Sequence, residues 1–270
     1  MPRLPLLLLS ALLVLPFHCP ASGPHWRQGW GLSATTPEMD LRHDTRLVLL
    51  QLQARGNGHA ALVRNLLAGP MQVRLRDADS GRAVAAATLL AAGEQRELLW
   101  HDDHAGPVRW LLDAFPGDPA AHPDDHLYRL PFDSPHVRVS QGFGGHYSHD
   151  DAQNRHAVDF PLAVGTPVFA ARAGTVMQVV EDAPDDGSLL RILHADGSMA
   201  VYAHLQGGGF RVRPGQHVEA GQVLALSGNS GRSSGPHLHF AVQANTGLAL
   251  VSIPFRMIGP QGELKFPRDP

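Results

Sequence analysis

Short apolar runs of strand length, separated by turn residues, dominate the first half of this chain. The clearest example is residues 71–76, where apolar and polar side chains alternate without exception, as in a half-buried strand. Similar runs recur at regular spacing over residues 45–52, 60–67, 83–90, 96–100 and 107–114. The run at 83–90 is rich in alanine and is also compatible with a short helix. Regularly spaced short strands predict a small β-sandwich.

From residue 137 onward, the strand signals are denser and the turns are richer in glycine. The expected strands are residues 157–160, 166–171, 175–180, 189–194, 199–204, 217–218, 223–226 and 237–242. No segment has the length and period of an amphipathic helix. We therefore predict an all-β protein in which a compact β-barrel or sandwich hybrid follows the smaller β-sandwich.

The two halves are separated by residues 115–125, which are rich in proline, aspartate and alanine and are typical of a linker or long surface loop. Residues 128–132 are expected to form the last strand of the first domain. The length of 270 residues fits two domains. We place the boundary near residues 131–135, with a β-sandwich-like domain over residues 24–130 and a second domain over residues 131–270.

Residues 1–21 have the features of an export signal. Arg3 gives a positive start, and residues 6–15 form an apolar run too short to span a membrane comfortably. An uncleaved membrane anchor is the alternative, and a lipid on Cys19 is disfavoured by the bulky residues before it. Cleavage after residue 21 would leave a chain with no cysteine and no stable membrane span. That composition fits a bacterial periplasm or cell envelope.

The overall composition narrows the classes of partner. The net charge is −3 with histidines counted as neutral, and no basic stripe is interleaved with aromatic residues. Nothing here indicates a nucleic acid as partner, and no motif identifies a protein partner. The 17 histidines are many for this length. A single histidine is therefore weak evidence, and only histidines that share a pattern are candidates for chemistry.

The most informative pattern lies in the turn at residues 233–236 and the expected strand at 237–242. Side chains of a strand alternate between its faces, so His237 and His239 project to the same side. Two neighbouring imidazoles on a rigid strand contribute poorly to a core. They are well suited to place a metal ligand beside an acid/base group.

Three further segments carry candidate chemistry. His149 follows a glycine-rich approach, Asp159 interrupts an apolar strand, and His204 lies at the end of another strand. A carboxylate in an apolar strand is costly to bury unless a cation compensates its charge. Two imidazoles and one carboxylate on Zn²⁺ leave a fourth position for water, as in catalytic zinc sites. Two further histidines near the metal are suited to proton transfer and oxyanion stabilisation.

In order, spacing and turn glycines, these segments resemble those of the lysostaphin-type zinc endopeptidases, murein hydrolases that cut peptide bridges in bacterial cell walls. The matching segments are residues 148–160, 165–168, 202–205, 228–231 and 235–240, within a resemblance that covers about residues 137–245. The resemblance implies a zinc metallopeptidase domain in the second half, with Zn²⁺ as cofactor and a peptidoglycan peptide as substrate. The implied zinc ligands are His149, Asp159 and His239, and the implied catalytic pair is His204 and His237.

The first ligand departs from the common spacing. Many members place this histidine four positions before the aspartate, where the chain has Arg155, whereas His149 lies ten positions before Asp159. His146 and His156 are alternative ligands. We favour His149 on the family match and because His156, three positions before Asp159, would face the other side of a continuous strand.

The function predicted is that of an exported zinc metalloendopeptidase that hydrolyses peptide bonds in peptidoglycan cross-links. One alternative is a non-catalytic relative that regulates other cell-wall hydrolases, but such relatives lack ligand residues that are present here. Another is a sugar-transport phosphocarrier, but its phosphate donors are cytoplasmic. Residues 231–235 also match the serine-hydrolase nucleophile elbow. That motif requires a turn from strand to helix, and because a strand follows here, Ser233 is not predicted to be a nucleophile.

Overall fold

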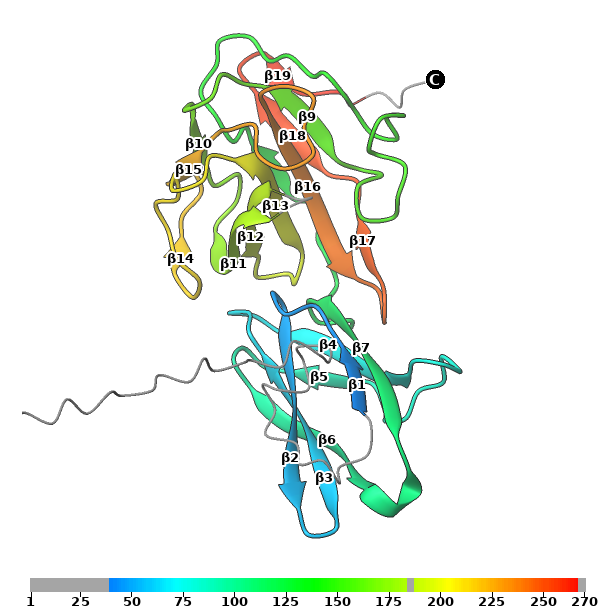
Figure 1. Cartoon of the computed structure of the whole chain (residues 1–270). Coiled ribbons are helices and arrows are strands. Elements are labelled where there is room, and N and C mark those ends of the chain that lie inside the picture. Colours follow the sequence, from blue (N-terminus) through cyan, green and yellow to red (C-terminus); the bar gives the residue numbers. More distant parts are fainter. Residues whose placement is uncertain (1–38, 184–186, 267–270) are drawn as a thin grey trace, which may run out of the picture. The chain divides into compact units, whose positions relative to one another are not determined.

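The computed structural model describes residues 39–183 and 187–266, and its regular structure is almost entirely β-strand (Figure 1). Within these ranges the helical structure is one 3₁₀ turn, Asp103–Ala105. The all-β prediction is therefore confirmed. The expected export signal and Cys19 lie outside the described residues. Over the part of the chain that is described, no helix combines the length and apolar character needed to cross a membrane.

The strands up to Pro116 form two sheets. One sheet has the order β1 (Met39–Arg42), β7 (Val108–Pro116), β4 (Met71–Asp77) and β5 (Thr88–Leu90), and the other has the order β2 (Val48–Arg55), β3 (Gly58–Asn65) and β6 (Gln95–Asp102). In β4, Met71, Val73 and Leu75 are fully buried and the residues between them are partly exposed, as the sequence alternation predicts. The alanine-rich run at 83–90 forms a strand only over its last three residues.

A seven-stranded sheet carries the candidate site. Its order is β14 (His217–Val218), β11 (Gly174–Ala183), β12 (Gly187–Leu193), β13 (Met199–Leu205), β16 (His237–Asn245) and β17 (Leu250–Ser252), with β9 (Val158–Pro161) also paired to β16. Figure 1 shows β11, β12, β13 and β16 side by side in this order. A separate two-stranded sheet contains β10 (Pro167–Phe169) and β15 (Val223–Leu226).

Strand β16 separates the hydrophobic core from the candidate site. Leu238, Phe240 and Val242 lie in the core, where the ring of Phe240 is edge-on to that of Tyr202 with centroids 5.2 Å apart. Each such buried side chain stabilises the fold by roughly 1.5–3 kcal/mol. Because alternate residues of a strand face opposite sides, His237 and His239 lie on the face away from this core.

The remaining strands form a three-stranded sheet, with the order β19 (Gly262–Glu263), β18 (Arg256–Gly259) and β8 (Leu127–Arg129). The expectation that the strand after the linker is the last of the first domain is wrong for β8. It pairs in parallel with β18, and Tyr128 lies in the same core as Phe240, with ring centroids 6.1 Å apart. Apolar alternation identifies a strand, but it does not identify a pairing partner more than a hundred residues away.

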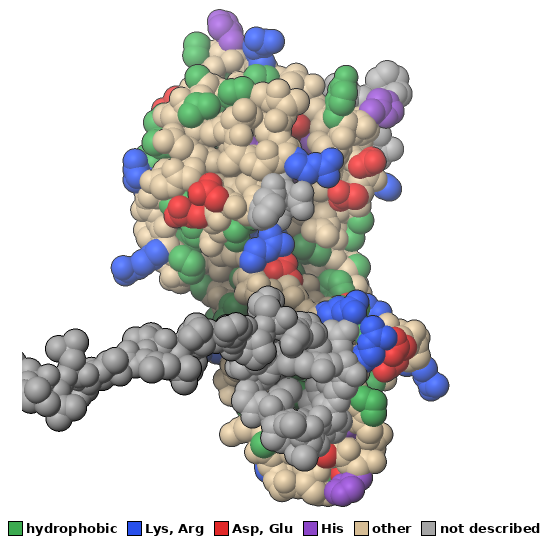
Figure 2. Space-filling view, in the orientation of Figure 1, with side chains coloured by type: hydrophobic (Ala, Val, Ile, Leu, Met, Phe, Trp, Pro, Cys, Tyr) green, Lys and Arg blue, Asp and Glu red, His purple; other side chains and the backbone are tan. Residues whose placement is uncertain are grey.

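Charged side chains are dispersed over the surface. On the face shown in Figure 2, acidic and basic side chains are interspersed, and among the described residues in that view neither sign gathers in a broad patch. This distribution agrees with the small net charge of −3.

Candidate metal centre

Asp159 and His239 lie directly opposite each other in the antiparallel pair β9 and β16. Opposite residues of such a pair hold their side chains on one face within reach of each other. Nδ1 of His239 is 2.9 Å from Oδ1 of Asp159, and Nε2 of His237 is 3.8 Å from the same oxygen. The prediction that His237 and His239 share a face is therefore confirmed.

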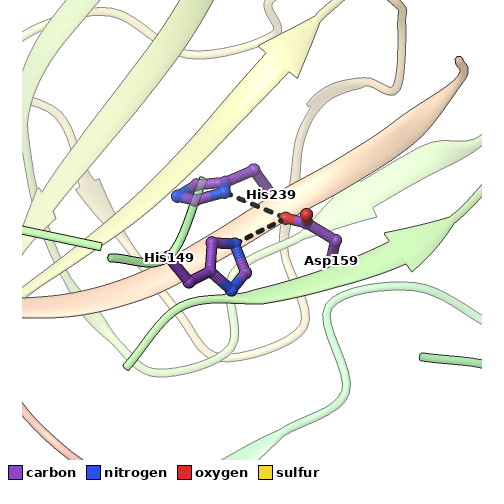
Figure 3. A group of neighbouring side chains, drawn as sticks. All are labelled: His149, Asp159 and His239. Carbon is purple, nitrogen blue, oxygen red and sulfur yellow. Dashed lines mark hydrogen bonds and ion pairs between the residues drawn. The ribbon is translucent and has the colours of Figure 1, made fainter. Parts of the chain in front are cut away.

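His149 reaches the same carboxylate from the glycine-rich loop before β9. Its Nδ1–H donates to the carbonyl oxygen of Gly142 at 2.7 Å, and its backbone N–H donates to the carbonyl oxygen of Gly145 at 3.0 Å. A carbonyl only accepts, so the Nδ1 proton is fixed and Nε2 is directed inward. That Nε2 lies 3.3 Å from Oδ1 of Asp159. Figure 3 shows the two imidazoles converging on the carboxylate.

These three side chains form a donor set that fits a metal ion. One ligand atom from each of His149, Asp159 and His239 lies within 4.8 Å of the others, and all three residues are buried. Two imidazole nitrogens and one carboxylate oxygen suit Zn²⁺. Structural zinc sites are closed by four protein ligands, whereas three ligands are typical of sites that keep a position open for chemistry.

The charge of Asp159 is maintained inside the protein. Burial alone would raise the pKa of this carboxyl, because desolvation penalises its charged form. Interactions with the imidazoles of His149 and His239 outweigh this effect and hold the pKa of Asp159 well below its usual range. Asp159 is therefore an anion at neutral pH, which is the protonation state that a metal ligand requires.

A second pair of imidazoles lies beside the donor set. The rings of His204 and His237 have centroids 4.6 Å apart, and the ring of His204 is 5.9 Å from that of His239. The Nδ1–H of His204 donates to the carbonyl oxygen of Ser230 at 2.8 Å, and that of His237 donates to the carbonyl oxygen of Gly235 at 2.7 Å. When neutral, both rings therefore have an unprotonated Nε2.

His204 has an unusual conformation and environment. Its φ of 59° lies in the left-handed region, which residues other than glycine seldom adopt. Burial lowers the pKa of His204 to about 4, with a smaller effect in the same direction from His237 and His239. In the absence of a bound cation the imidazole is therefore neutral at pH 7 and available as a proton acceptor.

The alternative ligands do not join this group. His156 directs Nδ1 to the carbonyl oxygen of Ser252 at 2.9 Å, with its ring edge-on to Phe143, and His146 is exposed. Ser233 donates its hydroxyl to the carbonyl oxygen of Gly235 at 2.9 Å. The imidazole nitrogen nearest that hydroxyl is Nδ1 of His237, which carries the proton, so the contact does not activate a nucleophile.

One contact to the donor set has no counterpart in the sequence predictions. The side-chain amide of Gln141 donates to Oδ2 of Asp159 at 3.1 Å. A single glutamine before a glycine-rich loop shows no periodicity and no ligand spacing. The only sequence signal available was its position at the start of the segment that leads to His149.

Residues 153–249 match the model of Peptidase family M23. This segment is therefore an M23 peptidase domain, and the predicted resemblance to the lysostaphin-type endopeptidases is confirmed. The donor residues Asp159 and His239 lie inside the match, and His149 lies four positions before it.

Individual relatives match part of this chain. The chain is 38% identical over 112 residues to an uncharacterized metalloprotease of Haemophilus influenzae, covering 40% of this chain and 23% of that protein. It is 36% identical over 115 residues to the peptidoglycan DD-endopeptidase ShyA of Vibrio cholerae, covering 42% and 26%. It is 34% identical over 92 residues to lysostaphin of Staphylococcus simulans, covering 34% and 18%. The chain thus spans about a quarter or less of the length of these relatives.

Lysostaphin also offers a structural comparison. The solved structure of this antimicrobial peptidase from Staphylococcus simulans aligns at 28% identity with a TM-score of 0.38, covering 44% of this chain and 47% of that chain.

Proposed function

We propose that this chain is an exported zinc metalloendopeptidase that hydrolyses peptide bonds in peptidoglycan cross-links. The observation that carries the proposal is the convergence of His149, Asp159 and His239 beside a second imidazole pair, within a chain that contains an M23 peptidase domain. The substrate class is supported by the relative named as a peptidoglycan DD-endopeptidase. Export to the periplasm or cell envelope is supported by the pattern of residues 1–21.

In this proposal the ligand atoms are Nε2 of His149, Oδ1 of Asp159 and Nδ1 of His239, which are the atoms that face one another. A zinc ion bound there would supply Lewis acidity and make water a stronger acid near neutral pH. The antiparallel pairing of β9 and β16 fixes two of the three ligands on rigid backbone. The ligands therefore need little reorganisation to bind the ion.

His204 and His237 have the proton chemistry that peptide hydrolysis requires. Each holds its Nδ1 proton on a backbone carbonyl, so each presents Nε2 as the proton acceptor. One of the two would take the proton from the attacking water. An imidazolium then presents an Nε2–H, which can stabilise the oxyanion or protonate the departing amine.

Two variants separate a ligand from a proton-transfer residue. We expect His239→Ala to lose both zinc and activity, because a ligand is removed from a three-ligand set. We expect His204→Ala to retain zinc and to lower turnover by about 10²–10⁴-fold, the range for a general acid/base. The measurements are the zinc content of the purified full chain and the mass analysis of fragments released from purified murein.

The outcomes distinguish the proposal from its alternative. If His204→Ala releases fragments at the wild-type rate, the role given to His204 is wrong. If the wild-type chain takes up no zinc and releases no fragments, the peptidase proposal fails and the metal-free regulator replaces it. The masses of the fragments identify the bond that is cut.

A further inference from the structure

Gln141 is a buried residue that is paired with Asp159 through both backbone and side chain. The backbone N–H of Asp159 donates to the carbonyl oxygen of Gln141 at 2.9 Å, in an isolated antiparallel bridge next to β9. Opposite residues in such a bridge place their side chains on the same face. The amide of Gln141 is therefore directed toward the carboxylate of Asp159 by the backbone itself.

The side-chain amide of Gln141 makes three hydrogen bonds. Its Nε2 donates to Oδ2 of Asp159 at 3.1 Å and to Oγ of Ser148 at 2.9 Å. Its Oε1 accepts from the backbone N–H of Tyr147 at 3.1 Å. A carboxylate only accepts and a peptide N–H only donates, so these partners determine which end of the amide is nitrogen. Gln141 thus links Asp159 to the two residues that precede His149.

The two oxygens of Asp159 consequently have different environments. Oδ1 faces the imidazoles of His149 and His239, at 3.3 and 2.9 Å. Oδ2 instead accepts a hydrogen bond from the side-chain amide of Gln141. These contacts fix the orientation of the carboxylate, so that only Oδ1 faces the imidazole nitrogens of the donor set.

We propose that Gln141 is a positioning residue for the metal centre: it makes Asp159 a one-oxygen ligand and fixes the loop that carries His149. The inference rests on the proposed function, because it concerns the same zinc site. Gln141 touches neither the substrate nor the reacting atoms in this role. It acts through Asp159 and through the backbone before His149.

Gly145 provides an independent observation in the same loop. A Cβ at this position would lie 2.2 Å from Cγ and 2.7 Å from Cδ of Gln141, which is closer than real Cβ contacts allow. Only glycine therefore leaves room for the Gln141 side chain in its observed place. The carbonyl oxygen of Gly145 also accepts the backbone N–H of His149, so the same glycine supports the residue that carries the first ligand.

The loss of this amide would have a defined effect. Oδ2 of Asp159 would lose its buried donor, and the carboxylate could rotate to present both oxygens to the ion. The loop before His149 would also lose the hydrogen bond from the backbone N–H of Tyr147 to the Gln141 side chain. Residues that orient metal ligands typically contribute 10–100-fold to metal affinity.

The test uses the full chain with Gln141→Leu, which keeps the approximate volume and removes the amide. We expect its zinc dissociation constant, measured by competition with a chromophoric chelator, to rise 10–100-fold. With Co²⁺ as the probe, we expect the visible absorption to weaken and shift, because this band reports coordination number and geometry. Gly145→Ala displaces the same side chain without altering its chemistry, and we expect it to change both readouts in the same direction.

The matched control is Gln243→Leu, which also removes a buried glutamine. The amide of Gln243 donates to the carbonyl oxygen of Gln153 at 3.0 Å and accepts from Arg191 at 2.7 Å, so it does not touch Asp159. We expect this control to be less stable to heat but to keep the wild-type zinc affinity and Co²⁺ spectrum.

Two results overturn the inference in different ways. If the wild-type chain binds zinc and the two loop variants bind it with unchanged affinity and an unchanged Co²⁺ spectrum, Gln141 does not position the site. Loss of zinc affinity in the Gln243→Leu control to the same extent would also refute a specific role. If the wild-type chain binds no zinc, the proposed function itself fails, and the role of Gln141 fails with it.

Discussion

The behaviour of an imidazole in this protein is determined by what lies beside it. His239 faces a carboxylate in the candidate metal centre, whereas His194 is buried at the edge of the core, with its ring 5.6 Å from that of Tyr128. The Nδ1–H of His194 donates to the carbonyl oxygen of Ala173 at 2.9 Å. Burial lowers the pKa of His194 to about 4, and the nearby Arg172 adds to this effect while Asp196 opposes it.

This buried histidine should make stability depend on pH. In the unfolded chain a histidine takes up a proton near pH 6.5, whereas folded His194 resists protonation until about pH 4. Its contribution to the unfolding free energy is therefore fully present above pH 6.5 and is lost as the pH falls toward 4, by up to roughly 3 kcal/mol. We expect the urea unfolding free energy to fall more steeply over this range in the wild type than in His194→Gln. Parallel pH profiles for the two proteins would contradict the assignment.

At the level of elements, local patterns were readable from the sequence and long-range pairings were not. The alternation over residues 71–76 predicted β4, and residues 223–226 were predicted as the strand that β15 forms. The partner of β8 was not predictable, because pairing with β18 depends on contacts between distant residues. The same distinction applies to the site. His237 and His239 were found from strand alternation, whereas Gln141 was missed because its role depends on the folded loop.

A side-chain hydrogen bond connects β13 to the segment just after β10, and its contribution to stability can be tested. Tyr202 is fully buried, and its hydroxyl accepts the backbone N–H of Ala171, just beyond β10, at 2.8 Å. Tyr202→Phe would leave that buried N–H without its acceptor, at a cost of about 1–3 kcal/mol. We expect a lower midpoint of chemical unfolding with unchanged zinc uptake. Tyr147→Phe is the matched control, because Tyr147 is 97% exposed. Equal midpoints for the two variants would show that the Tyr202 bond contributes nothing.

At the scale of the whole chain, the region that carries the site is tied together by strands from both of its ends. β8 precedes every strand of the seven-stranded sheet, and β18 follows them all, yet the two strands are hydrogen-bonded to each other. Tyr128 of β8 is 3% exposed and contacts the ring of Phe255, with centroids 6.0 Å apart. A boundary at residue 130 would therefore remove part of this core.

Two shortened chains test this assignment. One begins at residue 118 and keeps β8, and the other begins at residue 131 and lacks it. Loss of Tyr128 alone resembles a large-to-small core substitution of about 3–5 kcal/mol, which corresponds to a fall in Tm of roughly 10 °C for a region of this size. We expect the shorter chain to melt lower by at least this amount, measured by circular dichroism. In the full chain, Tyr128→Ala isolates the side-chain effect. If the two shortened chains have the same Tm, β8 does not contribute to the stability of this region.

The direct pairing of Asp159 with His239, residues 80 positions apart, makes the centre a check on correct assembly. A slip of one residue between β9 and β16 would turn one of these side chains to the opposite face and abolish the site. Chains in which these strands are misaligned would therefore lack the donor set. Under the proposed function, the chain would therefore become active only after these two strands have paired in the native register.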